Sequence, residues 1–303
     1  MICQNENSKI VLETKGYELH ECLDCGIIFS HKDGKQNINE AETYTNYYKK
    51  EKATRFGGPI EIVVKVFRFM RAYRIHLLRP NGKSILDIGS GRGWILYFMR
   101  KYFGYERTTG TQLSLNAYEF SKEKLKLEIY NKDLLEISFD TKFDVISILH
   151  VLEHVENIEL YVEKIYNLLN EKGLLFIEVP NYNAWSRKLT NEHWLALDLK
   201  HHLTFFTPET LISLLEKYNF KIKKVRTFSL EYSTFTSTQS ILNYITNTDS
   251  YFFEWLQNKT FNLKIFLHAF LFVIIFFPCL LINLCLYFSK YGEVITIYAE
   301  KND

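Results

Sequence analysis

The pattern of apolar and polar residues changes along the chain. Between residues 83 and 230, short apolar runs such as SILDI and FDVISIL alternate with longer stretches such as IELYVEKIYNLLN. The short runs are typical of buried strands, whereas the longer stretches repeat apolar residues at the spacing of an amphipathic helix. This alternation predicts an α/β fold, in which a doubly wound and mostly parallel sheet carries helices on both faces.

The regions before residue 83 have other patterns. Residues 1–34 contain a short alternating stretch, YELHE, followed by ECLDCGIIF. Residues 35–82 begin polar and then become amphipathic, which predicts a helical lead-in to the domain at residues 83–303. The apolar positions of this helix are Ile62, Val63, Val66, Phe67, Met70 and Tyr73, and the basic positions between them are Lys65, Arg68, Arg71 and Arg74.

Residues 265–288 form a nearly continuous apolar segment, interrupted by His268, Pro278 and Asn283. A helix of about 20 apolar residues is long enough to cross a bilayer. A buried core helix is the alternative, although this segment is longer than a typical globular helix. Pro278 lies near the middle of the segment and cannot donate a backbone hydrogen bond, so we expect two half-length helices that meet there.

The amino-acid composition limits which partners and which cellular compartment we expect for this protein. Of the 303 residues, 37 are Lys or Arg and 35 are Asp or Glu, so we expect no nucleic-acid partner. The five cysteines are odd in number and fall at the two ends of the chain, which does not fit a disulfide framework. The N-terminus lacks the pattern of a signal peptide, and we expect a cytoplasmic protein.

The stretch SILDIGSGRGW carries a glycine-rich turn. Asp87 ends a predicted strand, and Gly89, Ser90 and Gly91 begin the turn that opens a helix. Glycine allows positive φ and a close approach to a ligand, and a helix N-terminus offers N–H groups to an anionic moiety. The spacing G-x-G-x-G differs from the dinucleotide fingerprint G-x-G-x-x-G, which argues against NAD. A purely structural turn is the alternative interpretation.

With these motifs in this order, the chain resembles the class I S-adenosylmethionine-dependent methyltransferases. TTGTQLSLNAYEFSK resembles the second strand and helix of the family, FDVISILHVLEHVEN its fourth strand and loop, and HHLTFFTPETLISLLEKYNFKI a bacterial subgroup with the pattern HL-x-F-F-T. The resemblance implies a Rossmann-like, seven-stranded sheet with an antiparallel last strand, and S-adenosylmethionine as the cofactor. The implied cofactor-binding residues are Asp87, Gly89, Ser90, Gly91, Gln112, Asp133, Leu134 and His150.

One position departs from the family pattern. The family usually ends its second strand with Asp or Glu, which binds both ribose hydroxyls, and this chain has Gln112 there. A neutral amide forfeits charge-assisted hydrogen bonds, which are about twice as strong as neutral ones. We expect an active enzyme with weakened cofactor binding. A non-catalytic, membrane-docked scaffold with a degenerate methyltransferase fold is the alternative function.

Histidines are candidates for acting on the methyl acceptor. If the acceptor is a hydroxyl or an amine, a general base assists the reaction, and His titrates in a suitable range. The resemblance places His154 in the loop facing the acceptor and His202 at the acceptor pocket, and we predict both as catalytic residues. Capping and orienting that loop is the alternative role of His154 and its neighbour Glu153.

The N-terminal cysteines predict a metal site only in part. Cys22 and Cys25 have the spacing of a zinc knuckle, which is half of a site. Proteins that the chain resembles carry a four-cysteine ribbon before the methyltransferase domain. Here Cys3 remains for the other half, with His20 as a candidate fourth ligand. A complete zinc site, a degenerate ribbon that keeps its fold, and buried thiols are the open alternatives.

The resemblance also constrains the apolar segment. In the family the last two strands pair, and here they correspond to FKIKKVRTFSL and EVITIYAEK on either side of the segment. Both strands must lie on one side of any membrane, so the insertion at about residues 232–291 is expected to enter and return, or to lie flat. We therefore predict attachment to the inner face of the membrane through residues about 252–291, with an acceptor that is small or lipid-linked.

Overall fold

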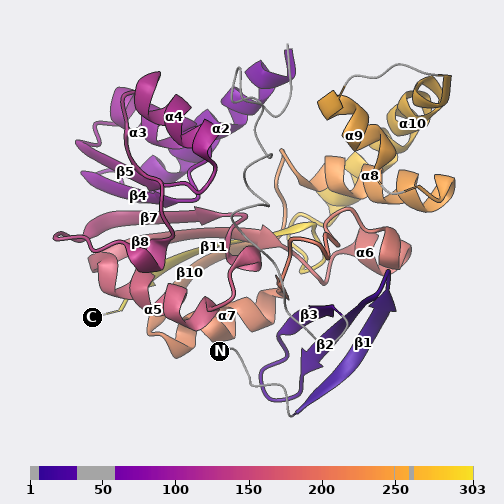
Figure 1. Ribbon diagram of the computed structural model, residues 1–303, viewed down its shortest axis with the longest axis horizontal. Coiled ribbons are helices and arrows are strands. Elements are labelled where there is room, and N and C mark those ends of the chain that lie inside the picture. The colour runs from indigo at the N-terminus through magenta and orange to yellow at the C-terminus, as the bar shows by residue number, and fades with distance from the viewer. Residues whose placement is uncertain (1–6, 33–58, 249, 259–262, 303) are drawn as a thin grey trace.

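The computed structural model describes residues 7–32, 59–248, 250–258 and 263–302. Figure 1 shows three parts: a large sheet with helices above and below it, a small sheet near the N-terminus, and a group of helices that stands beside the end of the large sheet. The large sheet and its helices form the α/β fold that the sequence predicts.

The large sheet has seven strands in the order β10-β11-β8-β7-β4-β5-β6. The pairs from β8 to β6 are parallel, and β11 runs antiparallel between β8 and β10. The predicted Rossmann-like sheet with an antiparallel last strand is therefore confirmed. The strands are β4 (Ser84–Ile88), β5 (Arg107–Thr111), β6 (Glu128–Tyr130), β7 (Phe143–Leu149), β8 (Leu169–Pro180), β10 (Phe220–Arg226) and β11 (Val294–Lys301).

Helices cover both faces of this sheet. One face packs against α2 (Pro59–Leu78), α3 (Trp94–Tyr102) and the loop after α4 (Leu115–Glu123), and its buried side chains include Leu96 and Met99. The other face packs against α5 (Ile158–Leu168) and α7 (Pro208–Lys217), where Val162 and Leu211 are fully buried. These apolar layers hold the carboxyl ends of the parallel strands in one plane, which is where ligands bind in such folds.

Helix α2 does not bury the face that its apolar pattern predicts. Val63 and Val66 are about half exposed, whereas Arg71 is only 4% exposed. The reason is electrostatic, because Arg71 forms ion pairs with Glu178 of β8 and with Glu231. Ion pairs with two carboxylates that are distant in the sequence thus hold Arg71 on the buried face of α2.

The small sheet contains β1 (Ser8–Thr14), β2 (Tyr17–Cys22), β3 (Ile28–Lys32) and β9 (Thr204–Phe205), all antiparallel. Strand β9 belongs to the methyltransferase-like part of the chain, so the N-terminal segment is joined to it by backbone hydrogen bonds. Leu19 and Ile28 also share a buried cluster with Trp194. Residues 7–32 are therefore packed onto the larger domain.

The insertion between β10 and β11 consists of α8 (Ser233–Thr246), α9 (Tyr251–Asn258) and α10 (Leu263–Cys285). The prediction of two half-length helices meeting at Pro278 was wrong, since α10 runs through Pro278 without interruption. A proline inside a helix removes one backbone hydrogen bond and favours a bend, but the other bonds of this long helix remain.

Candidate active site

The glycine turn lies between β4 and α3 and depends on left-handed backbone. Gly89 has a φ of 66° and Gly91 a φ of 55°, values that other residues adopt only with strain. The turn is held against β5, because Ser90 N–H donates a hydrogen bond of 2.9 Å to the carbonyl of Thr111. A Cβ at Gly89 would lie 2.3 Å from Cγ2 of Val151. The turn therefore packs closely between β5 and the loop after β7.

A cavity of about 570 Å³ lies at the carboxyl ends of β4, β5 and β7, and it extends to the insertion. Its volume is in the range of ligand-binding pockets. It is lined by residues of the glycine turn, of the loop after β7 that contains Glu153 and His154, and of helices α8 and α9. The lining includes every residue predicted to bind the cofactor or to act on the acceptor: Asp87, Gly89, Ser90, Gly91, Gln112, Asp133, Leu134, His150, His154 and His202.

Asp87, at the end of β4, is buried beneath the glycine turn. Its carboxylate accepts a hydrogen bond of 2.6 Å from the hydroxyl of Ser147 on β7. Burial raises the pKa of Asp87 to about 6, although this hydrogen bond and the neighbouring arginines Arg68 and Arg71 act in the opposite direction. Asp87 is therefore a fixed and partly protonated group at the floor of the cavity.

Gln112 and Asp133 are each bound to the protein on the side of the cavity opposite α2. The side-chain oxygen of Gln112 accepts a hydrogen bond of 2.9 Å from the N–H of Ser114, which begins α4. Asp133 accepts 2.8 Å from the N–H of Leu135, and its other oxygen accepts from the hydroxyl of Tyr161. These bonds hold both side chains in fixed orientations, and they leave the amide N–H₂ of Gln112 as its polar group for a ligand.

His150 follows β7 and lies between two buried carboxylates. Its Nε2 is 3.2 Å from Oε1 of Glu178, and its Nδ1 is 3.4 Å from Oε1 of Glu153, which is an ionic contact. Burial opposes a charge on His150, but Tyr232, Glu153 and Glu178 outweigh burial and raise its pKa to about 10. His150 also has a φ of 55°, a strained value for a residue with a side chain. It is therefore a cation at neutral pH.

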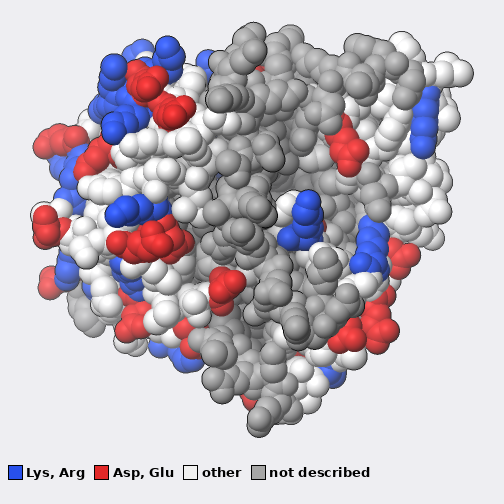
Figure 2. Space-filling model, in the orientation of Figure 1, with Lys and Arg blue, Asp and Glu red and all other residues white. Residues whose placement is uncertain are grey.

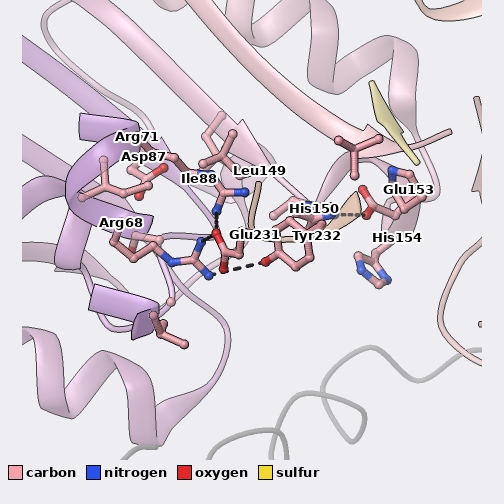
Figure 3. Close-up of a pocket in the computed structure, with 18 of the residues that line it drawn as sticks. Arg68, Arg71, Asp87, Ile88, Leu149, His150, Glu153, His154, Glu231 and Tyr232 are labelled. Atoms are coloured by element: carbon pink, nitrogen blue, oxygen red, sulfur yellow. Dashed lines mark hydrogen bonds and ion pairs between the residues drawn. The ribbon is translucent and has the colours of Figure 1, made fainter. Parts of the chain in front are cut away.

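A second group of charges, which the sequence did not predict, lies to one side of His150 (Figure 3). Arg71 pairs with Glu178 and Glu231, and Arg68 pairs with Glu231 at 3.0 Å. The ring of Tyr232 lies 4.4 Å from the ring of His150. Glu231 and Tyr232 stand just before α8, so the insertion itself completes this wall of the cavity. The basic positions of α2 were the only sequence signal for it.

His154, His202 and Glu153 meet on the acceptor side. The His rings lie 4.7 Å apart, and one ligand atom from each of the three side chains falls within 4.8 Å of the others, a spacing that can hold a metal ion. Each His directs Nδ1 to a backbone carbonyl at 2.9 Å, His154 to His201 and His202 to Ala196. We infer that Nδ1 carries the proton, which leaves Nε2 as an acceptor. Burial, followed by the proximity of His202, lowers the pKa of His154 to about 4.

Cys22 ends β2 of the small sheet and Cys25 follows it, and neither lines this cavity. Cys3 is outside the described residues. Cys22 is buried and Cys25 half-buried, on a tight turn closed by a 2.9 Å hydrogen bond from the N–H of Gly26 to the carbonyl of Cys22. His20 directs its ring nitrogens to Glu18, at 2.8 Å, and to Ser8, at 3.4 Å. Within the described part of the chain, no third ligand joins the two cysteines, and the zinc site stays a prediction.

Comparison with known proteins places the chain in a family. A family model for a methyltransferase domain matches residues 64–225, more than half of the chain, and this span contains the glycine turn, Gln112, Asp133 and His150. The chain belongs to this methyltransferase family. Its sheet order is that of the class I methyltransferase fold.

Individual relatives cover only part of this methyltransferase. The (S)-tetrahydroprotoberberine N-methyltransferase of Eschscholzia californica is 32% identical over 124 residues, which are 39% of this chain and 34% of the relative. The ubiquinone biosynthesis O-methyltransferase of Glaesserella parasuis is 32% identical over 134 residues, 36% of this chain and 56% of the relative. The chain thus spans about a third of the length of the first of these relatives and just over half of the second.

A solved structure shows the same fold at low identity. The crystal structure of coclaurine N-methyltransferase bound to N-methylheliamine and SAH matches with a TM-score of 0.50 and 14% identity. The match covers 88% of this chain and 80% of that one. At this identity the likeness concerns the fold, and the acceptor must be inferred from the site itself.

Proposed function

We propose that this methyltransferase transfers a methyl group from S-adenosylmethionine to a small or lipid-linked acceptor at the inner face of a membrane. The observation that carries the proposal is the shared cavity. One end is lined by the glycine turn, and the other by Phe235 of α8 together with Phe253 and Leu256 of α9. An acceptor with an apolar portion can therefore reach the cofactor from the side of the insertion. The N- and O-methyltransferases among the relatives support an N–H or O–H acceptor.

The residues present fit the cofactor. S-adenosylmethionine, when bound, supplies an electrophilic methyl group on a positively charged sulfonium. Gly89 and Gly91 have the left-handed backbone that permits a close approach, and the N-terminus of α3 follows them. The amide of Gln112 and the carboxylate of Asp133 would hold the polar edges of the nucleoside. Leu134, only 1% exposed, provides an apolar surface beside them.

On the acceptor side, the chain can position a nucleophile and accept its proton. His154 is neutral at pH 7 because its pKa is lowered to about 4. Its Nε2, like that of His202, can accept a hydrogen bond from an acceptor O–H or N–H. Such positioning accounts for much of the rate enhancement that a methyl transfer requires. A pKa this low makes His154 a weak base, so we propose orientation of the acceptor as its main role.

The exposure of apolar side chains on the insertion supports the proposal that the insertion attaches the protein to a membrane. On α10, Phe266, Phe270 and Phe277 are each more than 60% exposed. Within the most apolar part of this helix, 17% of the residues are buried, and the helix is long and apolar enough to span a bilayer. Figure 2 shows a mostly uncharged surface over α10, whereas Lys, Arg, Asp and Glu crowd the side of α3 and α4. Exposed apolar patches of this kind mark interaction surfaces.

The interface between α8 and α10 is polar, which also favours a lipid environment. Asn283 of α10 donates a hydrogen bond of 2.9 Å to Ser237 of α8, and Trp185 donates 3.1 Å to Asn283. Small and polar residues hold helices together where the surrounding solvent is itself apolar. Because β10 and β11 pair in one sheet, both ends of the insertion lie on the same side of the membrane. We propose that α10 lies along the membrane surface with its phenylalanines in the lipid.

A non-catalytic scaffold is the second candidate function, and one observation favours it. The side-chain oxygen of Gln112 already accepts a hydrogen bond from the N–H of Ser114. Gln112 can therefore donate hydrogen bonds to a ribose, but it has less capacity to accept them from the ribose hydroxyls. A calorimetric titration with S-adenosylmethionine, followed by incubation of the chain with labelled cofactor and membrane lipids, separates the two functions. We expect binding and a labelled lipid product. An absence of binding at millimolar cofactor would support the scaffold.

The zinc prediction needs its own measurement, because it concerns the small sheet. We propose metal analysis of the purified full chain, with a Cys22→Ser, Cys25→Ser variant as the control. About one equivalent of zinc in the wild type, lost in the variant, would support a complete site that uses ligands beyond the described residues. Less than about half an equivalent would leave the degenerate ribbon or the buried thiols.

A further inference from the structure

We propose that Glu293 anchors the polar group of the acceptor, by accepting a hydrogen bond from a hydroxyl or a protonated amine at the end of the cavity formed by the insertion. The inference rests on the proposed function, and it names the chemistry that the acceptor must carry. Glu293 precedes β11 and lines the same cavity as the glycine turn and the acceptor histidines.

The carboxyl group of Glu293 is buried, and only one of its two oxygens has hydrogen-bond partners among the described residues. It is 1% exposed. Its Oε2 accepts hydrogen bonds of 2.7 Å from the hydroxyl of Ser186 and 3.3 Å from the indole N–H of Trp194. Its Oε1 is buried and has no hydrogen-bond partner within the described residues. An unsatisfied buried oxygen is costly and uncommon, so a bound donor would stabilise it.

Among the described residues, none supplies a compensating charge to Glu293. Ser186 belongs to α6 (Trp185–Thr190), Trp194 follows it, and Cys279 of α10 is the titratable neighbour on the insertion side. None of the three is a cation. Burial raises the pKa of Glu293 to about 7, although the hydrogen bonds of Ser186 and Trp194 lower it. Near neutral pH, the carboxyl group of Glu293 therefore loses its proton readily when a hydrogen-bond donor or a cation binds beside it.

The position of Glu293 suits an acceptor with an apolar chain. The carbonyl of Glu293 accepts a hydrogen bond of 3.0 Å from the N–H of Asn181, immediately after β8, so it stands at the carboxyl edge of the sheet. Phe235 and Thr236 of α8 line the same cavity. A polar group bonded to Oε1 would leave the rest of the molecule against the aromatic side chains of the insertion. Glu178 and Glu231, in contrast, are already paired with arginines.

Dicyclohexylcarbodiimide tests the proposal, because this apolar reagent adds to protonated buried carboxyl groups. The acid proton moves to nitrogen and the carboxylate oxygen bonds to the carbodiimide carbon, which gives an O-acylisourea. Its acyl group then migrates from that oxygen to the neighbouring nitrogen, and the resulting N-acylurea can be located by peptide mass spectrometry. On neutral phosphatidylcholine liposomes, we expect labelling of Glu293 in the full chain to fall about tenfold between about pH 6 and about pH 8. Glu178, ionised because its pKa is lowered to about 2, should stay unlabelled.

The binding claim is tested by protection with two probes of defined chemistry. Dodecylamine and dodecanol carry the proposed polar groups, and dodecane has the chain alone. We expect dodecylamine or dodecanol to slow labelling of Glu293 severalfold and dodecane to leave it unchanged. Protection by the amine alone would identify a cationic acceptor, and protection by both would identify a hydrogen-bond donor of either charge. Equal protection by dodecane, or labelling absent at every pH, would overturn the proposal.

Two variants keep this result separate from the proposed function. Glu293→Gln should lose the label at that position while Asp87, with its pKa of about 6, still reacts. Its affinity for S-adenosylmethionine should equal that of the wild type, which also shows that the variant is folded. Glu300→Gln is the matched control and should not alter labelling of Glu293, because Glu300 lies on β11 and is paired with Lys223 at 2.8 Å. If the wild type bound no cofactor, the proposed methyltransferase function would be wrong. The protection experiment would still test separately whether Glu293 binds a polar group.

Discussion

Helix α5 and the helices of the insertion bury opposite kinds of side chains. Helix α5 turns Ile158, Val162 and Ile165 toward the sheet, as a helix surrounded by water does. Helix α8 buries Ser237, Gln239 and Asn243 instead, while α10 exposes Phe266 and Phe270. We propose that this difference reflects two solvents, with water around the sheet and its helices and lipid against the outer face of the insertion.

Several polar side chains buried in α8 form hydrogen bonds within the insertion, although the hydroxyl of Thr234 and Oε1 of Gln239 have no partner among the described residues. Ser237, Thr238 and Ser240 each donate to the carbonyl four residues earlier, at 2.9, 2.6 and 2.7 Å. The amide of Gln239 donates 2.8 Å to the side chain of Asn243. Hydroxyls bonded in this way present a small, nearly neutral surface to a neighbouring helix. Aromatic contacts add to this packing, since the ring of Phe272 on α10 lies 5.5 Å from that of Phe235 on α8 and 4.8 Å from that of Phe252 on α9.

The largest expected effect separates the cofactor site from the insertion. Gly91→Val places a branched side chain at a φ of 55° in the cavity wall, so we expect the affinity for S-adenosylmethionine to fall at least about 100-fold, or about 2.7 kcal/mol. Calorimetry measures the loss, and flotation with liposomes should be unchanged. Gly104→Val is the control, because Gly104 has a similar φ of 72° and an added Cβ there meets nothing within 4 Å. Cofactor binding by Gly91→Val at the wild-type affinity would show that the site is assigned wrongly.

The next effect concerns the apolar face of α10. Replacing Phe266, Phe270 and Phe277 with Asp removes side chains whose burial in lipid would contribute about 1.5–3 kcal/mol each. We expect the variant to remain in the soluble fraction during liposome flotation in high salt, with unchanged cofactor affinity. Leu115→Asp, an exposed leucine of α4, should float like the wild type. If the triple variant still floats, the attachment lies elsewhere on the molecule.

A smaller effect sharpens the contrast between the two interiors. Asn283→Leu removes the partner of Trp185 and of Ser237, so two buried polar groups lose a hydrogen bond. We expect a loss of about 1–3 kcal/mol in the free energy of unfolding, measured by denaturant titration in detergent. Leu281→Ala, on the exposed face of the same helix, should change stability much less. A more stable Asn283→Leu protein would mean that the interface prefers apolar side chains.

The smallest effect returns to the ribose side of the cofactor. Gln112→Glu keeps an oxygen for the N–H of Ser114 and adds a charged acceptor, so we expect cofactor binding to tighten by about 1 kcal/mol. Gln112→Met, which removes both polar atoms, should weaken it. Calorimetry compares the three proteins. Weaker binding by Gln112→Glu would indicate that this side chain does not face the ribose.

Much of the sheet could be predicted from the sequence, because each strand is a local signal. SILDI and FDVISIL are buried runs with turn residues beside them, and they became β4 and β7. The glycine turn was equally local, since three glycines in five residues define its backbone. Such features depend on neighbours within a few positions. The predicted cofactor residues line one cavity for the same reason, as they all end strands of that sheet.

The charge network and the helix faces could not be predicted, because they depend on residues far apart along the chain. Arg71 pairs with Glu178, which lies in a stretch that reads as an ordinary buried strand. Helix α8 reads as a polar surface segment, and only its contact with α10 shows why Ser237 and Gln239 are buried. Glu293 gave no signal either, since its burial follows from the packing of α6 beneath the insertion.

The contrast between the two solvents is tested most directly by two spin labels. A single cysteine at Phe270 or at Leu160, in a chain whose native cysteines are replaced by serine, carries a nitroxide on liposomes. Both positions are exposed, Phe270 on α10 and Leu160 on α5. We predict that the nitroxide at position 270 collides mainly with oxygen, which concentrates in lipid, and the one at position 160 mainly with a water-soluble nickel complex. Equal access of the nickel complex to both positions would contradict the account.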